Sequence, residues 1–300
     1  MKILVTGGSG FIGSHLVNAL VDKNHRVSVI DLKKGENKKV KYFVGDLLDK
    51  KFLEEVFKKE KFKAVFHLAA KTSVFESVKN PYDNFESNVV GSLNILEECR
   101  KNKIKYVLFA SSSTVYGNRG YCREKDKLFP VSPYGASKGS VDLYLNSYAN
   151  MYNMNISSLI LANIYGPGNE KGVIYDFYNK LKKNQKELEI LGDGNQSKSY
   201  VYIDDCVKAF ILVFYKMVEG EVSGCNYFNV GSDEQMSVKG IAKTISKILG
   251  VNPVYKFTET WKGDVTNFLL DNSKLKRLGW RIENNTEKGI EKYLMYLIKN

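Results

Sequence analysis

A glycine-rich turn near the N-terminus restricts the fold of this chain more than any other feature. Gly7, Gly10 and Gly13 follow the spacing GxxGxxG. The apolar run 2–6 before them predicts a buried strand, and the segment 11–21 predicts a helix. Glycine allows this tight turn and lets the backbone approach a pyrophosphate, which the N–H groups of the helix N-terminus can bind. The turn therefore predicts a dinucleotide site formed by Gly7, Gly10, Phe11, Ile12 and Gly13; the alternative is a turn that needs glycine only for packing.

Strand-like and helix-like segments alternate through the first half of the chain. The strand-like runs are largely apolar, which is typical of strands covered on both faces; they lie at 2–6, 26–30, 41–44, 64–68, 106–110 and 155–161. The segments that predict helices are 11–21, 51–59, 82–101 and 133–151. Such alternation indicates parallel βαβ units. We therefore expect an α/β fold with a Rossmann-type, doubly wound parallel sheet.

The alternation becomes less regular after Asn163, where loops with glycine appear at 165–168 and 192–195. We expect residues 1–162 to form the dinucleotide-binding Rossmann domain. Residues 163–300 are expected to form mainly a smaller C-terminal α/β lobe that binds the substrate. Part of the segment 195–218 is expected to return to the Rossmann domain.

Two aspartates stand at the ends of the second and third predicted strands. Asp31 lies 18 residues after Gly13. A carboxylate at this place accepts hydrogen bonds from both ribose hydroxyls and repels a 2′-phosphate, which favours NAD over NADP. Asp46 either accepts a hydrogen bond from the adenine or serves only as a turn residue.

Tyr134 and Lys138 form a YxxxK motif in the segment 133–151. At i and i+4 they lie on one face of the predicted helix. An ammonium at ~4 Å, in an effective dielectric of about 20, stabilises a phenolate by about 4 kcal/mol, which is roughly 3 pK units. We therefore expect Lys138 to bring the pKa of Tyr134 toward neutrality and Tyr134 to act as a general base.

A run of hydroxyl side chains, Ser111, Ser112 and Ser113, follows the fifth predicted strand. In open α/β sheets, ligands bind beyond the carboxyl ends of the strands. A hydroxyl at this edge can hold a substrate oxygen while Tyr134 takes its proton. The glycine turn, the YxxxK motif and the serine run therefore predict one shared crevice.

Composition excludes several other classes of protein. With 300 residues, 43% of them hydrophobic, the chain can bury a large core. Its longest wholly apolar run, 209–215, is much shorter than the about 20 residues of a membrane span, and the apolar N-terminal stretch is too short for a signal peptide. Four cysteines without a CxxC pair predict reduced thiols. We expect a cytoplasmic protein without a membrane partner.

The net charge of +12 favours anionic partners. The lysines are spread along the whole chain, and neither zinc-finger spacing nor an RNP-type motif accompanies them. We therefore expect a solvated, lysine-rich surface and no nucleic-acid partner. The three histidines, His15, His25 and His67, are too scattered for a metal site, so no metal is expected.

Together these motifs resemble the extended short-chain dehydrogenase/reductase family, in its NAD-dependent epimerase/dehydratase branch. The chain looks most similar to the UDP-glucose 4-epimerases, from residue 1 to about residue 280. The matching segments are 7–13, 31, 46–47, 67–70, 88, 111–117, 134–138, 163–167, 192–194, 200–205 and 263–265.

The resemblance implies a reaction and the roles of three residues in it. NAD is a bound, recycled cofactor. Tyr134 removes the proton of the sugar 4-hydroxyl as hydride leaves C4 for NAD⁺, and Ser112 is the catalytic hydroxyl. Lys138 lowers the pKa of Tyr134 and binds the nicotinamide ribose. The 4-keto sugar then turns over and takes the hydride back on its other face, so the implied activity is 4-epimerisation of a nucleotide sugar of the UDP-glucose/UDP-galactose type.

The resemblance also implies the binding residues. Those for NAD are Gly7, Gly10, Phe11, Ile12, Gly13, Asp31, Asp46, Leu47, Leu68, Ala69, Ala70, Asn88, Tyr134 and Lys138. Those for the substrate are Ser112, Ser113, Tyr134, Asn163, Lys198, Lys262 and Asp264. Lys198 and Lys262 stand where the family usually has arginines. Lysine acts on a diphosphate as a point charge, whereas arginine can bind it in a bidentate manner.

Related activities and the oligomeric state are also expectations from the family. The 4,6-dehydratases have Asp-Glu directly after the catalytic hydroxyl, where this chain has Ser113 and Thr114, which argues against dehydration. The alternatives are another nucleotide-sugar enzyme, such as a UDP-glucuronate or UDP-N-acetylhexosamine epimerase or a reductase, and, more remotely, a non-catalytic NAD-binding protein, which would typically lack the YxxxK motif. Family members usually pair through two helices, so we expect a homodimer through 82–101 and 133–151.

Overall fold

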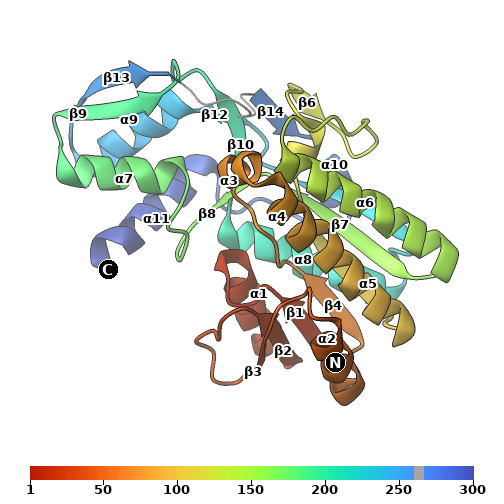
Figure 1. The fold of residues 1–300 in the computed structure, drawn as a ribbon. Coiled ribbons are helices and arrows are strands. Elements are labelled where there is room, and N and C mark those ends of the chain that lie inside the picture. Colours follow the sequence, from red (N-terminus) through yellow and green to blue (C-terminus); the bar gives the residue numbers. More distant parts are fainter. Residues whose placement is uncertain (260–266) are drawn as a thin grey trace.

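A parallel sheet forms the centre of the molecule (Figure 1). The computed structural model describes residues 1–259 and 267–300. The seven strands lie in the order β11–β7–β5–β4–β1–β2–β3, and all neighbours are parallel. This topology confirms the Rossmann-type doubly wound fold, because the chain starts in the middle of the sheet and winds outward in both directions. In chain order the strands are β1 (Lys2–Thr6), β2 (Arg26–Asp31), β3 (Lys41–Val44), β4 (Ala64–His67), β5 (Tyr106–Ser112), β7 (Asn155–Leu161) and β11 (Cys225–Val230).

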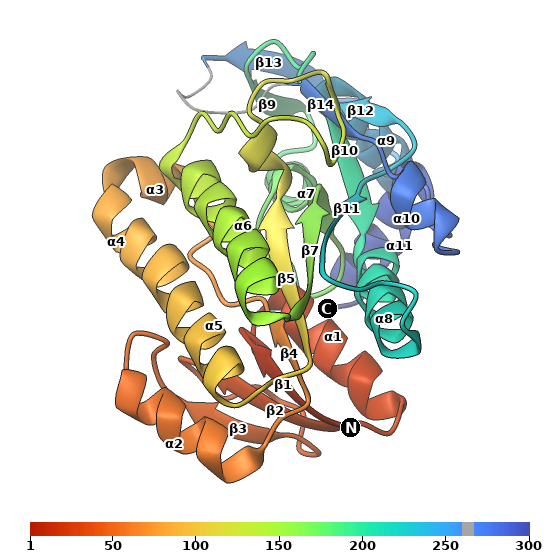
Figure 2. The ribbon, with the colours of Figure 1, turned by 90° about the vertical axis from the view of Figure 1, so that its right-hand side faces the viewer.

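Helices cover both faces of this sheet (Figure 2). One face carries α1 (Phe11–Asp22) and α8 (Ile203–Glu219); the other carries α2 (Lys50–Glu60), α5 (Gly91–Lys101) and α6 (Pro133–Tyr152). Successive side chains of a strand point to opposite faces. In β1, Ile3 and Val5 therefore belong to the core on the side of α1 and α8, and Leu4 belongs to the core on the other side. Strands covered on both faces need apolar side chains throughout, which explains the apolar runs in the sequence.

The helix that carries the YxxxK motif begins and ends at residues suited to those places. The Ser132 hydroxyl accepts a hydrogen bond from the N–H of Gly135 (3.1 Å), and Pro133 is the first residue of α6. Asn153 ends the helix in the left-handed conformation, with a φ of 51°. These boundaries place Tyr134 in the first turn of α6, at the carboxyl edge of the sheet.

The sequence predicts one regular helix over 82–101, but the structure shows that this segment is interrupted. It consists of α4 (Pro81–Phe85), a π-helical turn η1 (Glu86–Val90), and then α5. The π turn contains the buried Asn88. Such turns are frequent at functional sites because they redirect side chains out of the regular helical pattern.

The second lobe is built around a smaller sheet. Its strands are β12 (Gln235–Ser237), β10 (Ser197–Tyr202), β14 (Asn267–Leu270) and β6 (Tyr121–Cys122), with β8 (Asn163–Tyr165) also paired to β10. A separate pair joins β9 (Glu187–Leu191) to β13 (Val254–Thr258). The helices of this half are α7 (Val173–Lys183), α9 (Val238–Leu249), α10 (Ser273–Arg277) and α11 (Thr286–Lys299). The two lobes exchange segments, since β6 comes from the first half of the chain whereas α8 and β11 complete the large sheet.

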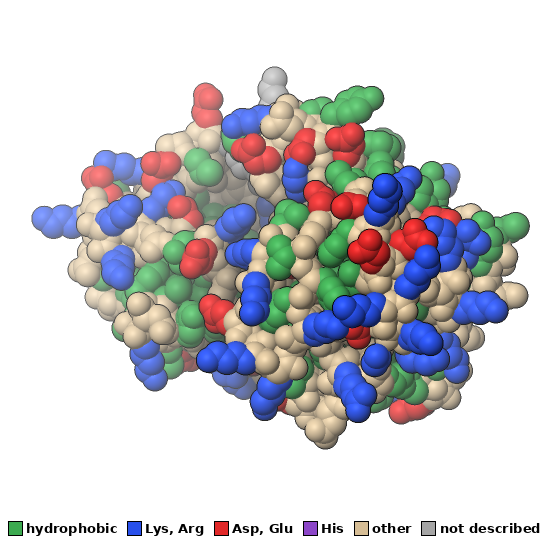
Figure 3. All heavy atoms as spheres, turned by 60° about the horizontal axis from the view of Figure 1, so that its bottom comes forward, with side chains coloured by type: hydrophobic (Ala, Val, Ile, Leu, Met, Phe, Trp, Pro, Cys, Tyr) green, Lys and Arg blue, Asp and Glu red, His purple; other side chains and the backbone are tan. Residues whose placement is uncertain are grey.

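Charged side chains are spread over the surface. On the face seen in Figure 3, Lys and Arg side chains are distributed among Asp, Glu and apolar side chains. Within the described ranges, no helix is both long and apolar enough to span a bilayer. All four cysteines are free thiols.

Candidate active site

Three segments that the sequence predicts to bind ligands lie at the ends of adjacent strands. The glycine turn follows β1, residues 68–70 follow β4, and the serine run lies at the end of β5. The strand β4 pairs in parallel with both β1 and β5, so their carboxyl ends meet at one edge of the sheet. This is the edge at which ligands bind in open α/β sheets.

The glycine turn leaves space for phosphates because it carries no side chains. A Cβ on Gly7, whose φ is +71°, would lie 2.6 Å from the amide nitrogen of Ala69. A Cβ on Gly13 would lie 2.0 Å from the carbonyl oxygen of Gly7. Gly10 precedes the first turn of α1, and no side chain caps this helix, which leaves its first N–H groups to a bound anion. The turn therefore fits the pyrophosphate of a dinucleotide.

The two candidate aspartates differ in their surroundings. Asp31, at the end of β2, accepts hydrogen bonds from the N–H groups of Ser9 (3.0 Å) and Lys33 (3.3 Å), which hold its carboxylate beside the glycine turn. Asp46 is exposed and accepts a hydrogen bond from the N–H of Leu48 (3.0 Å), as a turn aspartate does. Its contact with an adenine stays a prediction, and the neighbouring Leu47 is buried in the core.

Asp31→Ala is expected to weaken NAD binding by about 10–100-fold, because the substitution removes a charged acceptor and hydrogen bonds to charged groups contribute about 1.5–3 kcal/mol. Titration calorimetry on protein stripped of NAD measures the affinity. Asp46→Ala provides the comparison at an exposed turn, and its effect is expected to be smaller. An Asp31→Ala protein that binds NAD as tightly as the unmodified chain would contradict this role.

Asn88 connects the loop after β4 to the helix with the YxxxK motif. Its Oδ1 accepts a hydrogen bond from the N–H of Lys71 (2.8 Å), and its Nδ2 donates to the carbonyl of Lys71 (3.0 Å). The same Nδ2 donates to Ser137 Oγ (3.0 Å) on α6. By binding both backbone groups of Lys71, Asn88 therefore holds the loop 69–71 in place. This role requires the Asn88 side chain to point inward from the π turn.

Tyr134 and Lys138 are both buried where α6 packs on β5. The ammonium of Lys138 donates a hydrogen bond to the carbonyl of Ala110 (2.9 Å), and the backbone N–H of Tyr134 donates to Ser77 Oγ (3.1 Å) in α3 (Val74–Lys79). Burial raises the pKa of Tyr134 to about 12, and its hydrogen bond with Ser112 opposes this shift. Burial lowers the pKa of Lys138 to about 8.

The expected fall of the Tyr134 pKa toward neutrality is therefore wrong for the protein alone. The phenol has lost its contact with water, which penalises the phenolate. Meanwhile the ammonium of Lys138 donates to the Ala110 carbonyl. Burial therefore has a larger effect on the pKa of Tyr134 than its interaction with Ser112.

The structure separates the two serine candidates. Ser112 ends β5, and its side chain lies close enough to the Tyr134 phenol to oppose the rise of the Tyr134 pKa. Its Oγ also accepts hydrogen bonds from the N–H (3.3 Å) and the hydroxyl (2.9 Å) of Thr114. Ser113 is buried at the start of the 3₁₀ turn η2 (Ser113–Tyr116). The hydroxyl that lies beside Tyr134 is thus that of Ser112.

Two other residues predicted to bind the nucleotide sugar lie in the second lobe. Asn163 begins β8 and Lys198 is the second residue of β10, and these two strands pair in parallel. Lys198 is also in register with Phe268 of β14. Lys262 and Asp264 lie outside the described residues, so their predicted contacts stay predictions.

Further buried polar residues lie at this edge. His67, which the sequence places at the end of a strand, lies between Thr6 Oγ1 (2.6 Å from Nδ1) and Ser92 Oγ (2.8 Å from Nε2), and burial lowers its pKa to about 3, so the imidazole is neutral. Ser77 and Asp142 were not found from the sequence. The position of Asp142, four residues after Lys138, could have indicated it; nothing in the sequence marks Ser77.

The sequence matches the NAD dependent epimerase/dehydratase family over residues 3–231. The UDP-glucose 4-epimerase of Thermotoga maritima, determined with UDP-glucose, is 34% identical with a TM-score of 0.93, covering 100% of this chain and 99% of that chain. The UDP-glucose 4-epimerase of Thermus thermophilus, in complex with NAD, is 31% identical with a TM-score of 0.91, covering 99% of each chain. The UDP-N-acetylglucosamine 4-epimerase of Methanobrevibacter ruminantium, in complex with UDP-N-acetylmuramic acid, is 32% identical with a TM-score of 0.88, covering 99% and 98%. The chain therefore belongs to the NAD dependent epimerase/dehydratase family, and its cofactor is NAD.

Proposed function

We propose that this protein is a nucleotide-sugar 4-epimerase of the UDP-glucose/UDP-galactose type, acting through a transient 4-keto sugar. The observation that carries the proposal is that the Tyr134 and Ser112 side chains lie close together at the carboxyl edge of β5, the edge that also holds the glycine turn. Ser113 and Thr114 follow Ser112, so this strand end offers no carboxylic acid to assist loss of water. The pair suits reversible oxidation of a sugar hydroxyl without elimination.

Each side chain has a separate task in this reaction. Tyr134, as the phenolate, takes the proton of the sugar 4-hydroxyl and later returns it, and Ser112 Oγ holds the same oxygen. Lys138, anchored on the Ala110 carbonyl, supplies positive charge behind the phenol. When bound, NAD⁺ supplies the acceptor and donor of hydride and a positive charge that favours the phenolate.

A UDP-N-acetylhexosamine 4-epimerase is the second candidate, favoured by the similarity to the Methanobrevibacter ruminantium enzyme. That enzyme is 32% identical to this chain, which is comparable to the 34% and 31% of the two UDP-glucose 4-epimerases. Both candidates use the same chemistry at C4. They differ in the group at C2 of the sugar, so the choice between them is one of substrate.

The test is to incubate the purified protein with UDP-galactose, without added cofactor, and to follow UDP-glucose by chromatography. UDP-N-acetylgalactosamine is assayed in parallel. Conversion without a net change in NADH absorbance is the expected result. Net consumption of NADH would instead indicate a reductase, and no conversion of either sugar with NAD⁺ supplied would contradict 4-epimerisation of both.

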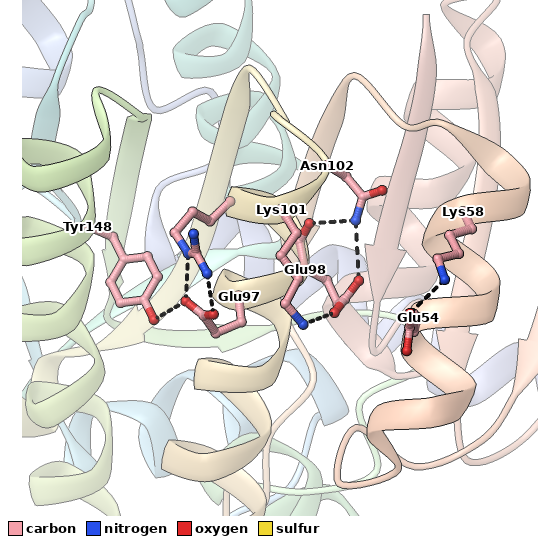
Figure 4. A network of polar contacts seen from close by, with 8 residues as sticks. Glu54, Lys58, Glu97, Glu98, Lys101, Asn102 and Tyr148 are labelled. Atoms are coloured by element: carbon pink, nitrogen blue, oxygen red, sulfur yellow. Dashed lines mark hydrogen bonds and ion pairs between the residues drawn. The ribbon is translucent and has the colours of Figure 1, made fainter.

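We also propose that the protein is a homodimer that pairs through α4–α5 and α6. Apolar side chains are exposed on these helices, among them Leu143 (67% exposed) and Met151 (73%), together with Tyr82, Phe85 and Tyr144. The two helices are joined to each other, since Tyr148 Oη of α6 donates to Glu97 Oε1 of α5 (2.7 Å; Figure 4). Within α5, Arg100 binds Glu97 in a bidentate manner. Apolar side chains on a jointly held pair of helices are typical of a dimer surface.

Leu143→Glu is expected to convert the dimer to a monomer. The substitution places two symmetry-related carboxylates in an apolar interface, and truncating or charging such a central contact costs about 2–4 kcal/mol. Light scattering after size-exclusion chromatography measures the mass. Met295→Glu, on the exposed face of α11 away from these helices, is the matched control and is expected to leave the mass unchanged. A Leu143→Glu protein that remains a dimer would place the interface elsewhere.

A further inference from the structure

A third titratable side chain lies in line with the two that the proposed reaction uses. Tyr134, Lys138 and Asp142 occupy positions i, i+4 and i+8 of α6, which places them on one face of the helix. They are 8%, 3% and 2% exposed. This face packs against β5 and β7, and the reaction described above leaves Asp142 without a task.

Hydrogen bonds hold Asp142 in a form that can carry negative charge. Its Oδ2 accepts from Ser111 Oγ (2.5 Å) on β5, and its Oδ1 accepts from Ser158 Oγ (2.6 Å) on β7. Tyr227 Oη of β11 donates to the backbone carbonyl of Asp142 (2.8 Å), which ties this part of α6 to the sheet. Burial raises the pKa of Asp142 to about 6, while the two serine hydroxyls and the charge of Lys138 oppose the shift.

Lys138 has few other groups to stabilise its charge. Its ammonium donates to the carbonyl of Ala110 and lies 4.5 Å from the centre of the Phe109 ring. The negative charge of Asp142 opposes the burial that lowers the pKa of Lys138. A buried ammonium without a counter-charge loses its proton readily.

We propose that Asp142 is a positioning residue that keeps Lys138 protonated during the reaction, as the buried counter-charge of its ammonium. Ser111 and Ser158 hold the carboxylate in place. Ser111 directly follows Ala110, so adjacent residues of β5 bind the two members of the pair. Asp142 thereby acts on Tyr134 through Lys138 and touches neither sugar nor cofactor.

Most of the other titratable groups around this pair are neutral near pH 8. Burial lowers the pKa of His67 and raises the pKa values of Tyr116, Tyr227 and Cys225. From α3 and η1, the side chains of Ser77 and Asn88 hydrogen-bond to α6, and neither of them titrates. The charged groups nearby are Glu97 of α5, which binds Tyr148 further along α6, and Lys274 of α10, which binds the Tyr227 carbonyl.

Asp142→Asn is expected to move the alkaline limb of the kcat–pH profile to lower pH by at least one unit. Removing the negative charge disfavours the ammonium, so the pKa of Lys138 falls below its value of about 8 and the proton is lost earlier as the pH rises. Asp142→Glu keeps the charge and is expected to restore the limb. A purely structural role would instead lower kcat equally at every pH.

Ser158→Ala is the matched control. It removes one buried hydrogen bond to the carboxylate and leaves the charge, because at pH 8 Asp142 stays ionised even with a raised pKa. The alkaline limb of this variant is expected to coincide with that of the unmodified protein. The proposal would be overturned if the alkaline limb of Asp142→Asn also coincided with that of the unmodified protein.

This pH profile rests on the epimerase activity proposed above, so a second arm uses no activity at all. The ¹³C resonance of the Asp142 side-chain carboxyl, identified by its loss in Asp142→Glu, is titrated in the unmodified protein and in Lys138→Met. Because coupling is reciprocal, removing the ammonium is expected to raise the pKa of Asp142 by at least one unit from about 6. An unchanged titration would overturn the proposal whether or not the protein epimerises sugars or Asp142→Asn folds.

Discussion

Tyr134→Phe is expected to lower kcat for the interconversion of UDP-galactose and UDP-glucose by about 10²–10⁴-fold, the usual contribution of a positioned acid–base group. Phe keeps the ring that packs at the start of α6 and removes only the hydroxyl. Because Ser77 and Ser132 bind the backbone of this turn rather than the phenol, the helix is expected to keep its place. The loss should therefore appear in kcat, with little change in NAD content.

Initial rates measured by chromatography of the UDP sugars give kcat, and the absorbance of the denatured supernatant gives bound NAD. Tyr296→Phe removes an exposed hydroxyl from α11, far from this edge, and is expected to leave both unchanged. Full activity in Tyr134→Phe would remove the phenol from the mechanism and leave Ser112 as the candidate for proton transfer.

Gly13→Ala is expected to yield protein that purifies without NAD and unfolds at lower temperature. The added Cβ would lie 2.0 Å from the carbonyl oxygen of Gly7 and 2.8 Å from the Cα of Gly8. Both are backbone atoms that no side-chain rotation can move, so the turn or the start of α1 must shift. Overpacking of this kind costs about 1–3 kcal/mol, and the shift also moves the N–H groups that would bind the phosphates.

The ratio of absorbance at 260 and 280 nm reports bound NAD, and a thermal melt reports stability. Gly120→Ala is the control, because a Cβ there meets nothing within 4 Å and Gly120 has no left-handed φ. A Gly13→Ala protein with normal NAD content would show that the turn does not carry the cofactor as proposed.

Local geometry accounts for what could be predicted at the site. The glycine spacing and the strand before it predict the turn, since the need for glycine arises from contacts within the same βαβ unit. Tyr134 and Lys138 share a helix face because of the helical period alone. The serine run at the end of β5 could be placed at the ligand edge, but which hydroxyl lies beside Tyr134 could not, because η2 begins at Ser113 and turns it inward.

Other features required segments far apart in the sequence to be brought together. The pKa of Tyr134 shifts opposite to expectation, because desolvation depends on everything packed around the phenol, whereas the helical period reveals only one neighbouring charge, that of Lys138. The inward direction of Asn88 depends on a π turn that no periodic pattern marks. The smaller sheet includes β6 from the first half of the chain, and the large sheet includes β11 from the second half. The alternation of strands and helices along the sequence does not predict these two placements.

The sequence by itself determined the Rossmann-type fold, the cofactor turn and the Tyr134–Lys138 pair, because strand alternation, glycine's backbone freedom and the helical period act between residues close along the chain. Only the tertiary structure decided the burial that raises the pKa of Tyr134, the choice of Ser112, and the hydrogen bonds that Ser111 and Ser158 donate to Asp142. Those depend on how β5, β7 and α6 pack together, and desolvation is set by what surrounds a group in space rather than by separation in sequence.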